Sequence, residues 1–259
     1  MRVATWNVNS IKAHMDVVAR WLNEAKPDVV CLQEIKCEDQ NFPQAVFEEL
    51  NYTAAVHGQK TYNGVAILSK FPLENVIRRL PGDDSDEQAR YIQATVMDGK
   101  SNPTIASIYL PNGNPVNSDK YPYKLAWLDR LTAHARELMK LEEPLVLAGD
   151  YNVIPAAIDA KTPSQWVNDA LFLTATRLKF QEQAALGLTD AFRALHPATA
   201  NQYTFFDYQA GAWQRGNGIR IDHMMLSPQA ADKLISAQID RHVRGWEKPS
   251  DHVPLVIEI

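Results

Sequence analysis

Seven short apolar runs rich in β-branched residues recur along the chain, and the first six pass directly into polar residues. Runs of this length and composition, bounded by polar or turn-forming residues, are typical of buried strands. The predicted strands are Arg2–Val8, Asp28–Gln33, Gly64–Ser69, Thr104–Leu110, Leu145–Ala148, Ile221–Leu226 and Val253–Ile259.

Two longer segments between these runs repeat their apolar residues with the period of an α-helix. One predicted helical face consists of Val17, Val18, Trp21, Leu22 and Ala25. The other consists of Leu125, Leu128, Leu131, Ala135, Leu138 and Met139. Because strands and helices alternate along the chain, we expect a layered α/β protein.

The composition indicates a globular domain with a large core. Of 259 residues, 46% are hydrophobic and 22% charged, and no Gly/Ser linker, low-complexity run or internal repeat divides the chain. A single domain over residues 1–259 is therefore expected, and nothing in the sequence requires more than a monomer. The polar start and the lack of an apolar run of about 18 residues predict a cytoplasmic protein without membrane contact.

The charge and the cysteines narrow the choice of function only slightly. Cys31 and Cys37 are too few for a disulfide framework and lack the spacing of a zinc site, and Cys31 is expected to pack in the core. Lys and Arg number 26 against 31 Asp and Glu, a formal charge of −5, which neither excludes nor favours DNA. An acidic metal site would account for several negative charges. The C-terminal part is richer in cations, namely Arg215, Arg220, Arg241, Arg244 and Lys248.

The polar residues that flank the predicted strands are the informative feature of the pattern. Side chains at strand ends can converge on one rim of a sheet, so distant positions can build one site. These residues are Asn7, Asn9, Gln33, Glu34, Tyr109, Asp150, Asn152, Asp222, Asp251 and His252.

Two of these positions suggest metal and proton chemistry, although each has an ordinary alternative. Glu34 ends the run PDVVCLQ and is either a solvated strand end or a ligand for a hard cation such as Mg²⁺. Asp150 and Asn152 in GDYN either form a turn or act as a pair. In the second case the carboxylate would transfer a proton, and the amide would hold a phosphate oxygen or water.

Further candidates lie near the C-terminus and in the middle of the chain. A carboxylate beside His252 would raise the pKa of the imidazole and make it a cation that contacts phosphate, and both Asp222 and Asp251 could supply it. Tyr109 is either a core residue or a phenol that binds a phosphate oxygen. The acidic run Asp83–Glu87 is interpreted as a solvated loop. Four histidines are interpreted as structural: His57, His134, His196 and His223.

Taken in order, these residues resemble the exonuclease III family of abasic-site endonucleases, within the endonuclease/exonuclease/phosphatase superfamily. The matching stretches run from one end of the chain to the other. They are TWNVNSI, PDVVCLQEIK, HGQKTYNGVAILSK, PGDDSDEQAR, YLPNG, LAGDYN, TFFDY, RGNGIRIDHMMLS and EKPSDHVPLV. LQE, GDxN and SDH also occur in superfamily members that cleave other phosphoesters, whereas PGDDSDEQAR, RGNGIRID and EKPSDH look like bacterial exodeoxyribonuclease III.

The resemblance implies a fold, a cofactor and an activity. The fold is a deoxyribonuclease-I-like four-layer sandwich, with two mixed β-sheets face to face and helices outside. The implied activity is Mg²⁺-dependent hydrolysis of double-stranded DNA, 5′ to abasic sites and from 3′ ends, with Mn²⁺ as a substitute metal. The alternatives are another metal-dependent phosphoesterase of the superfamily, such as a phosphoinositide phosphatase, or a catalytically silent DNA-binding member.

By the same resemblance, residue roles can be assigned. Glu34 is the principal metal ligand, and the other implied ligands are Asn7, Asp150, Asn152, Asp251 and His252. The implied catalytic residues are Tyr109, Asp150, Asn152, Asp222 and His252. The implied substrate contacts are Phe205, Ile219 and Arg90.

Two departures from the family pattern concern the substrate pocket. Ile219 stands where animal relatives carry a Trp, as an aliphatic residue tends to do in bacterial relatives, and Phe205 is the facing aromatic. The segment 160–185 lacks the charged run expected from close bacterial relatives, so no DNA contact is assigned to it.

Overall fold

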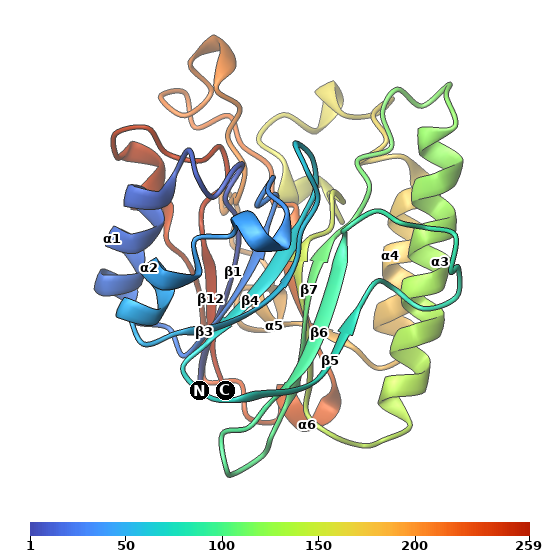
Figure 1. The fold of residues 1–259 in the computed structure, drawn as a ribbon. Coiled ribbons are helices and arrows are strands. Elements are labelled where there is room, and N and C mark those ends of the chain that lie inside the picture. The colour runs from blue at the N-terminus through green and yellow to red at the C-terminus, as the bar shows by residue number, and fades with distance from the viewer.

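The computed structural model describes residues 1–259 and contains two six-stranded sheets packed face to face, with helices outside both (Figure 1). Helices α1 and α2 cover one sheet, and α3 and α4 cover the other (Figure 1). The predicted four-layer α/β sandwich is therefore confirmed. The N- and C-termini lie side by side at one end of the molecule, where Met1 and Ile259 are hydrogen bonded (Figure 1).

The first sheet has the strand order β11-β12-β1-β2-β4-β3 and is antiparallel except for the pair β1 and β2. Its strands are β1 Arg2–Asn7, β2 Val29–Gln33, β3 Thr53–His57, β4 Val65–Ser69, β11 Ser236–Ile239 and β12 Leu255–Glu258.

The second sheet has the order β5-β6-β7-β8-β10-β9, and β7 and β8 form its one parallel pair. Its strands are β5 Leu73–Arg78, β6 Tyr91–Val96, β7 Thr104–Tyr109, β8 Leu145–Asp150, β9 Thr189–Asp190 and β10 Asp222–Leu226. The seven predicted strands thus correspond to β1, β2, β4, β7, β8, β10 and β12.

The helices differ greatly in length. The α-helices are α1 Met15–Ala25, α2 Gln44–Glu49, α3 Lys120–Met139, α4 Thr174–Ala185, α5 Ala191–Leu195 and α6 Pro228–Ala231. The 3-10 turns are Asp39–Asn41, Ala157–Asp159, Pro163–Gln165, Gln209–Gly211 and Arg241–Gly245.

Three apolar clusters hold the four layers together. The cluster between the sheets includes Val3, Val29, Ile92 and Val146, one from each of four strands. One further cluster lies between the first sheet and its helices, and another lies between the second sheet and its helices. Cys31 is fully buried in the cluster between the sheets, as predicted.

The predicted face of α1 is confirmed, because all five of its residues are buried. The face predicted for α3 is partly wrong. Leu138 and Met139 are half-buried and pack against the cluster, but Leu125 is half-buried and lies outside it, whereas Lys124 and Trp127 are fully enclosed. The helix is turned so that the large Trp127 ring packs with Leu128 and Leu131, which removes more apolar surface from water.

Candidate active site

The predicted polar residues meet at one edge of the sandwich, where the parallel strand pairs end. Asn7 is the last residue of β1, and Glu34 directly follows β2. Tyr109 and Asp150 end β7 and β8 and are paired in register. Because parallel strands end at the same edge of a sheet, these four side chains converge although the sequence separates them widely. The convergence expected from strand ends is confirmed.

Asn7 links the two carboxylates at the centre of this edge. Its Nδ2 atom donates to Glu34 Oε1 at 2.8 Å and to Asp150 Oδ2 at 3.0 Å. Glu34 also accepts from Lys36 Nζ at 2.9 Å. Glu34 has φ of +50°, a left-handed conformation that is uncommon for residues other than glycine and that clusters at functional sites.

A buried imidazole lies on the other side of Asp150. His252 Nδ1 is 2.8 Å from Asp222 Oδ2, and His252 Nε2 is 3.7 Å from Asp150 Oδ2. Asp222 opens β10 and lies opposite Asp150 in the antiparallel register. The Trp6 indole donates to the main-chain oxygen of His252 at 3.0 Å and so fixes its backbone. The structure therefore brings Asp222, rather than Asp251, to the imidazole.

The enclosed carboxylates set the protonation states of these groups. Burial alone lowers the pKa of His252, but Asp222 and Asp150 outweigh it and raise that pKa, so the imidazole carries both protons. Burial and the charge of Asp222 raise the pKa of Asp150 to about 7. Burial, with the charges of Glu34 and Asp150, raises the pKa of Tyr109 well above its usual value. Of these three groups, Asp150 is the one whose pKa lies near neutrality.

The donor set fits a hard divalent cation. The ligand atoms of Asp150, Asp222 and His252 lie within 4.8 Å of one another. A doubly protonated imidazole has no lone pair to offer, so the carboxylates are the better donors. Burial tends to raise the pKa of Glu34, but the hydrogen bond from Asn7 and the charge of Lys36 prevail and lower it. Glu34 is therefore ionised, and its carboxylate lies with that of Asp150 around the side-chain amide of Asn7. Carboxylate oxygens are the ligands that Mg²⁺ prefers.

The other predicted site residues lie around this centre. Asn152 Nδ2 donates to the Leu110 carbonyl at 2.9 Å, and Asn152 Oδ1 accepts from Asn112 at 3.1 Å. Asp251 lies at the periphery, where its Oδ1 accepts from Asn9 Nδ2 at 3.2 Å.

Arg90 and a nearby lysine add positive charge to the site. The Arg90 guanidinium lies over the Tyr109 ring, 4.8 Å from its centroid, and donates to the Tyr109 carbonyl at 3.3 Å. Lys36, which pairs with Glu34, was not selected from the sequence. Its position two residues after Glu34 was the only available signal.

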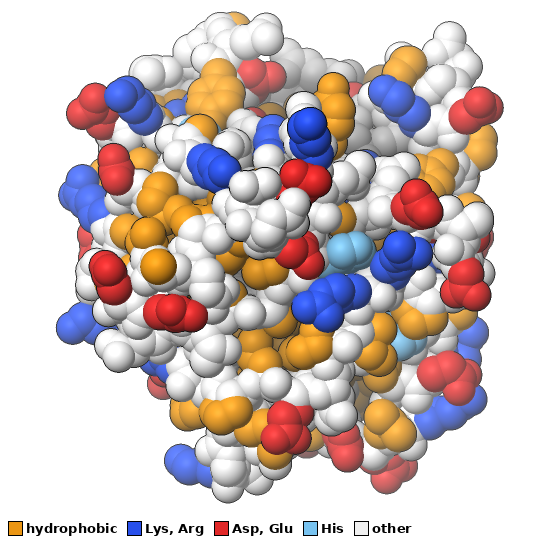
Figure 2. All heavy atoms as spheres, in the orientation of Figure 1, with side chains coloured by type: hydrophobic (Ala, Val, Ile, Leu, Met, Phe, Trp, Pro, Cys, Tyr) orange, Lys and Arg blue, Asp and Glu red, His pale blue; other side chains and the backbone are white.

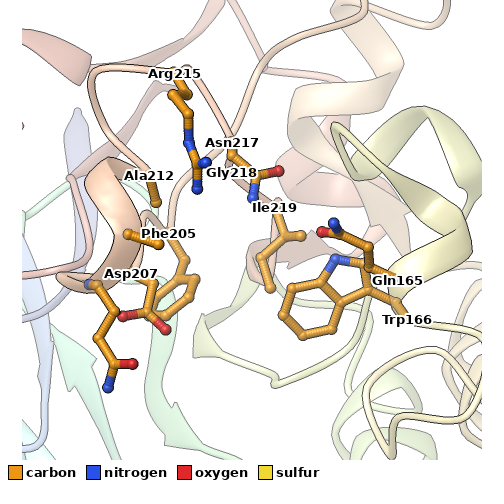
Figure 3. Close-up of a pocket in the computed structure, with 11 residues that line it drawn as sticks. Gln165, Trp166, Phe205, Asp207, Ala212, Arg215, Asn217, Gly218 and Ile219 are labelled. Carbon is orange, nitrogen blue, oxygen red and sulfur yellow. The ribbon is translucent and has the colours of Figure 1, made fainter.

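A cavity of about 280 Å³ adjoins the site. Phe205 and Ile219 both line it, and Phe205 also contacts His252, with ring centroids 5.0 Å apart. Figure 3 shows Phe205 and Trp166 on either side of Ile219, with the guanidinium of Arg215 extending toward the same space. Trp166 comes from the segment 160–185 and was missed, because a single Trp in a polar loop carries no periodic signal.

A buried ion network anchors the segment that carries Trp166. Asp159 accepts from Arg220 Nε at 2.7 Å and from Arg193 at 2.5 Å, and Arg220 also pairs with Asp190 at 2.9 Å. Burial costs an isolated charge several kcal/mol, so this mutual pairing is what allows the fully buried Arg220. Arg220, one of the cations of the C-terminal part, is therefore paired in the interior and not exposed at the surface.

The acidic run is also only partly a solvated loop. Asp83, Asp84 and Glu87 are exposed. Asp86 is instead tied to α3, where its carboxylate accepts from Arg130 at 2.8 Å and from the Tyr123 hydroxyl at 3.0 Å. This anchor holds the loop that leads to Arg90.

The four histidines interpreted as structural all have hydrogen-bond partners. His57, His134 and His196 contact Tyr91 O, Gln93 Oε1 and Ala237 O. His223 is fully buried between Arg220 and the carbonyl of Val153, at 2.9 Å from each. Its pKa is lowered to about 4 by burial and by Arg220, so this ring is neutral.

Comparison with known proteins accords with this geometry. The model of the endonuclease/exonuclease/phosphatase family matches residues 4–252. The chain belongs to this family. Within it, the chain is a member of the exonuclease III and abasic-site endonuclease group, as its full-length relatives show.

Three of these relatives cover nearly the whole chain. Exodeoxyribonuclease III of Haemophilus influenzae is 31% identical over 100% of this chain and 99% of its own length. An AP endonuclease from Archaeoglobus fulgidus has a TM-score of 0.94 at 37% identity, covering 100% and 99% of the two chains. NExo, a 3′-5′ exonuclease from Neisseria meningitidis, reaches 0.95 at 39% identity with the same coverage. A second NExo structure is described as a 3′ phosphatase bound to a product DNA hairpin.

Proposed function

We propose that this protein is a Mg²⁺-dependent DNA repair nuclease that hydrolyses the phosphodiester 5′ to abasic sites and trims 3′ ends of duplex DNA. The observation that carries the proposal is the position of Asp150, with the Asn7 and Glu34 pair on one side and the protonated His252 on the other. A carboxylate able to accept a proton, opposite a cationic donor, suits attack of water on a phosphate.

Glu34 would be the principal ligand of the metal, with Asn7 and Asp150 beside it. Asn152 and Asp251 would supply further ligands, whereas the doubly protonated His252 has no lone pair to offer. The bound ion would offset the negative charge of the phosphodiester and stabilise the leaving oxygen.

The side chains of the site would have separate roles in proton transfer and in the stabilisation of negative charge. Asp150 would take a proton from the attacking water, since its pKa of about 7 suits a base near neutral pH. Tyr109 would stay protonated and donate to a phosphate oxygen, because its raised pKa makes it a poor base. His252, oriented by Asp222, would donate through Nε2 to a phosphate oxygen, where negative charge develops in the transition state. Asn152 would hold a nonbridging oxygen or the water.

The cavity beside His252 would accept the sugar of an abasic site. A nucleotide without a base loses no stacking when it leaves the duplex, so it is extruded at lower cost. Phe205, Ile219 and Trp166 supply apolar walls, and Arg215 supplies a cation for a flanking phosphate. Elsewhere on the surface, the face seen in Figure 2 has positive and negative side chains interspersed, so the few cations around the site would contribute most to DNA binding.

A 3′ phosphatase activity on the same site is the second candidate. It is favoured by the 38% identity to NExo, whose structure with a DNA hairpin is described in those terms. Hydrolysis of a terminal phosphate uses the same attack and needs no extruded sugar. The two candidate functions therefore require the same roles for Asp150 and His252, and only incision at an abasic site requires the cavity.

Three matched duplexes would test the proposal, carrying an internal tetrahydrofuran abasic analogue, a 3′-phosphate or an intact 3′ end. We expect incision at the abasic analogue with Mg²⁺ and none with EDTA. Glu34→Gln should weaken Mg²⁺ binding in calorimetry and lower kcat/KM by about 100-fold, as loss of metal-site groups typically does. Glu24→Gln, at an exposed glutamate paired with His242, is the matched control. Cleavage that persists in EDTA would contradict the metal role, and activity on the 3′-phosphate alone would favour the second candidate.

A further inference from the structure

A completely buried lysine lies beneath the two loops that carry the polar groups of the site. Lys124, in the first half of α3, is fully inaccessible to solvent. Its Nζ atom donates to the main-chain oxygens of Asn112, at 3.0 Å, and Asn152, at 2.5 Å. Asn112 follows β7 and Asn152 follows β8, so one amino group joins the two loops.

Burying the Lys124 side chain costs free energy, which its hydrogen bonds must offset. Burial lowers the pKa of Lys124 to about 7, and its hydrogen-bond partners are two neutral carbonyls rather than a carboxylate. The chain also makes room for it. Gly113 has φ of +88°, and a Cβ there would lie 2.6 Å from Lys124 Cδ, so a larger residue would block the path of the lysine.

The contact with Asn152 reaches the proposed base through one short chain of bonds. Asn152 has φ of +48°, a conformation that its neighbours must hold in place. The backbone N–H of Asn152 donates to Asp150 Oδ1 at 2.9 Å, so the position of the Asp150 carboxylate depends on this peptide. Asn112 Nδ2 donates to Asn152 Oδ1 at 3.1 Å, and Lys124 ties the same two residues through their main-chain oxygens.

We propose that Lys124 is a positioning residue for phosphoester hydrolysis, which clamps the loops after β7 and β8 and thereby fixes Asn152 and Asp150. The kinetic part of this inference rests on the proposed function. The conformational part does not, because it concerns the order of the loops in the free protein.

Lys124→Met tests the clamp, because Met retains most of the apolar stem and removes the donor. We expect kcat on the best substrate to fall by about 10- to 100-fold, since small misplacements of catalytic groups cost this much, with KM for DNA changed less than about twofold. Lys140→Met makes the same exchange at an exposed position just after α3 and should leave both constants unchanged. Leu131→Ala removes buried contacts from the same helix and should lower the melting temperature while kcat is retained.

Hydrogen exchange of the metal-free protein provides a readout that needs no activity. In Lys124→Met, amides of residues 110–114 and 150–154 should exchange faster, while those in the middle of α3 stay protected. In Leu131→Ala, amides in the middle of α3 should exchange faster, while those of residues 110–114 and 150–154 stay protected. Unchanged kcat in Lys124→Met, or an equal fall of kcat in Leu131→Ala at a similar loss of melting temperature, would overturn the clamp. If the unmodified protein cleaves none of the three duplexes, the proposed function fails, and loop exchange alone then supports or overturns the clamp.

Discussion

His252 shows how neighbouring charges control a single residue in this site. Its ring is almost fully buried, yet two carboxylates lie within 4 Å of its nitrogens. Burial disfavours the imidazolium, whereas Asp222 and Asp150 favour it more strongly and raise the pKa to about 10. Because Asp222 also raises the pKa of Asp150, one carboxylate keeps the donor protonated and delays ionisation of the base.

Replacing the Asp222 carboxylate should therefore shift the pKa of the His252 imidazole in a predictable direction. In Asp222→Asn the ring loses its nearest negative charge, so the pKa of His252 should fall by about 1–3 units. NMR titration of the metal-free protein would measure this, with His223 as an internal control because its low pKa has other causes. The loss in kcat/KM for Asp222→Asn combined with His252→Gln should be little greater than that of the worse single variant. Strictly additive losses, or an unmoved His252 pKa, would contradict the coupling.

At the scale of elements, the cavity is assembled from segments that local sequence does not bring together. Ile219 forms isolated β-bridges with both Ala160 and Phe205, and Phe205 forms one with His252. The turn that carries Trp166 is attached to the body of the protein by the Asp159 ion network. The pocket is thus held beside the His252 imidazole by pairing between distant segments.

Truncation of the pocket walls should alter the choice of substrate more than the chemistry. Ile219→Ala and Trp166→Ala enlarge the cavity, so they should narrow the gap in kcat/KM between the abasic analogue and the intact 3′ end. A few missing methylenes change discrimination by about 1–3 kcal/mol, and the larger ring of Trp166 should lie at the upper end of that range. Ile235→Ala, at an exposed isoleucine before β11, is the control. An unchanged ratio would remove these residues from the pocket, and equal losses on both substrates would indicate general support of the site.

At the scale of the whole molecule, both sheets depend on one shared interior. The cluster between them takes residues from Val3 near one end of the chain to Ile257 near the other. Strands β1 and β12 are paired, so the first and last strands lie next to each other in the first sheet. No helix of the structure is both long and apolar enough to cross a membrane. We propose that residues 1–259 form a single domain.

A single domain should unfold in one cooperative transition. Trp21 lies between the first sheet and α1, and Trp127 lies between the second sheet and α3, so the two rings report on opposite halves. With fluorinated tryptophan, the native ¹⁹F signals of both should disappear at the same urea concentration, together with the far-ultraviolet circular dichroism. Trp21→Phe and Trp127→Phe would assign the signals. Separate midpoints for the two rings would mean that the sheets are independent units.

Elements whose pattern is locally strong could be predicted from the amino-acid sequence. The continuous apolar runs ending at Asn7, Gln33 and Asp150 predicted buried strands, because strands covered on both faces carry apolar residues throughout. The polar residues after these runs identified the rim of the sheets. The resemblance to exonuclease III supplied the topology and the residue roles, which neither periodicity nor spacing contains.

Features that depend on contacts between distant segments could not be predicted from the sequence. Strand β5 is largely exposed and β9 has two residues, so neither carries an apolar pattern, and β3, β6 and β11 were also missed. Lys124 resembles any helical lysine until the fold closes two loops over it. Trp166 and Asp86 resemble loop residues until the Asp159 network and α3 enclose them. Their environments arise from pairing across long sequence separations, and local propensity carries no information about such pairing.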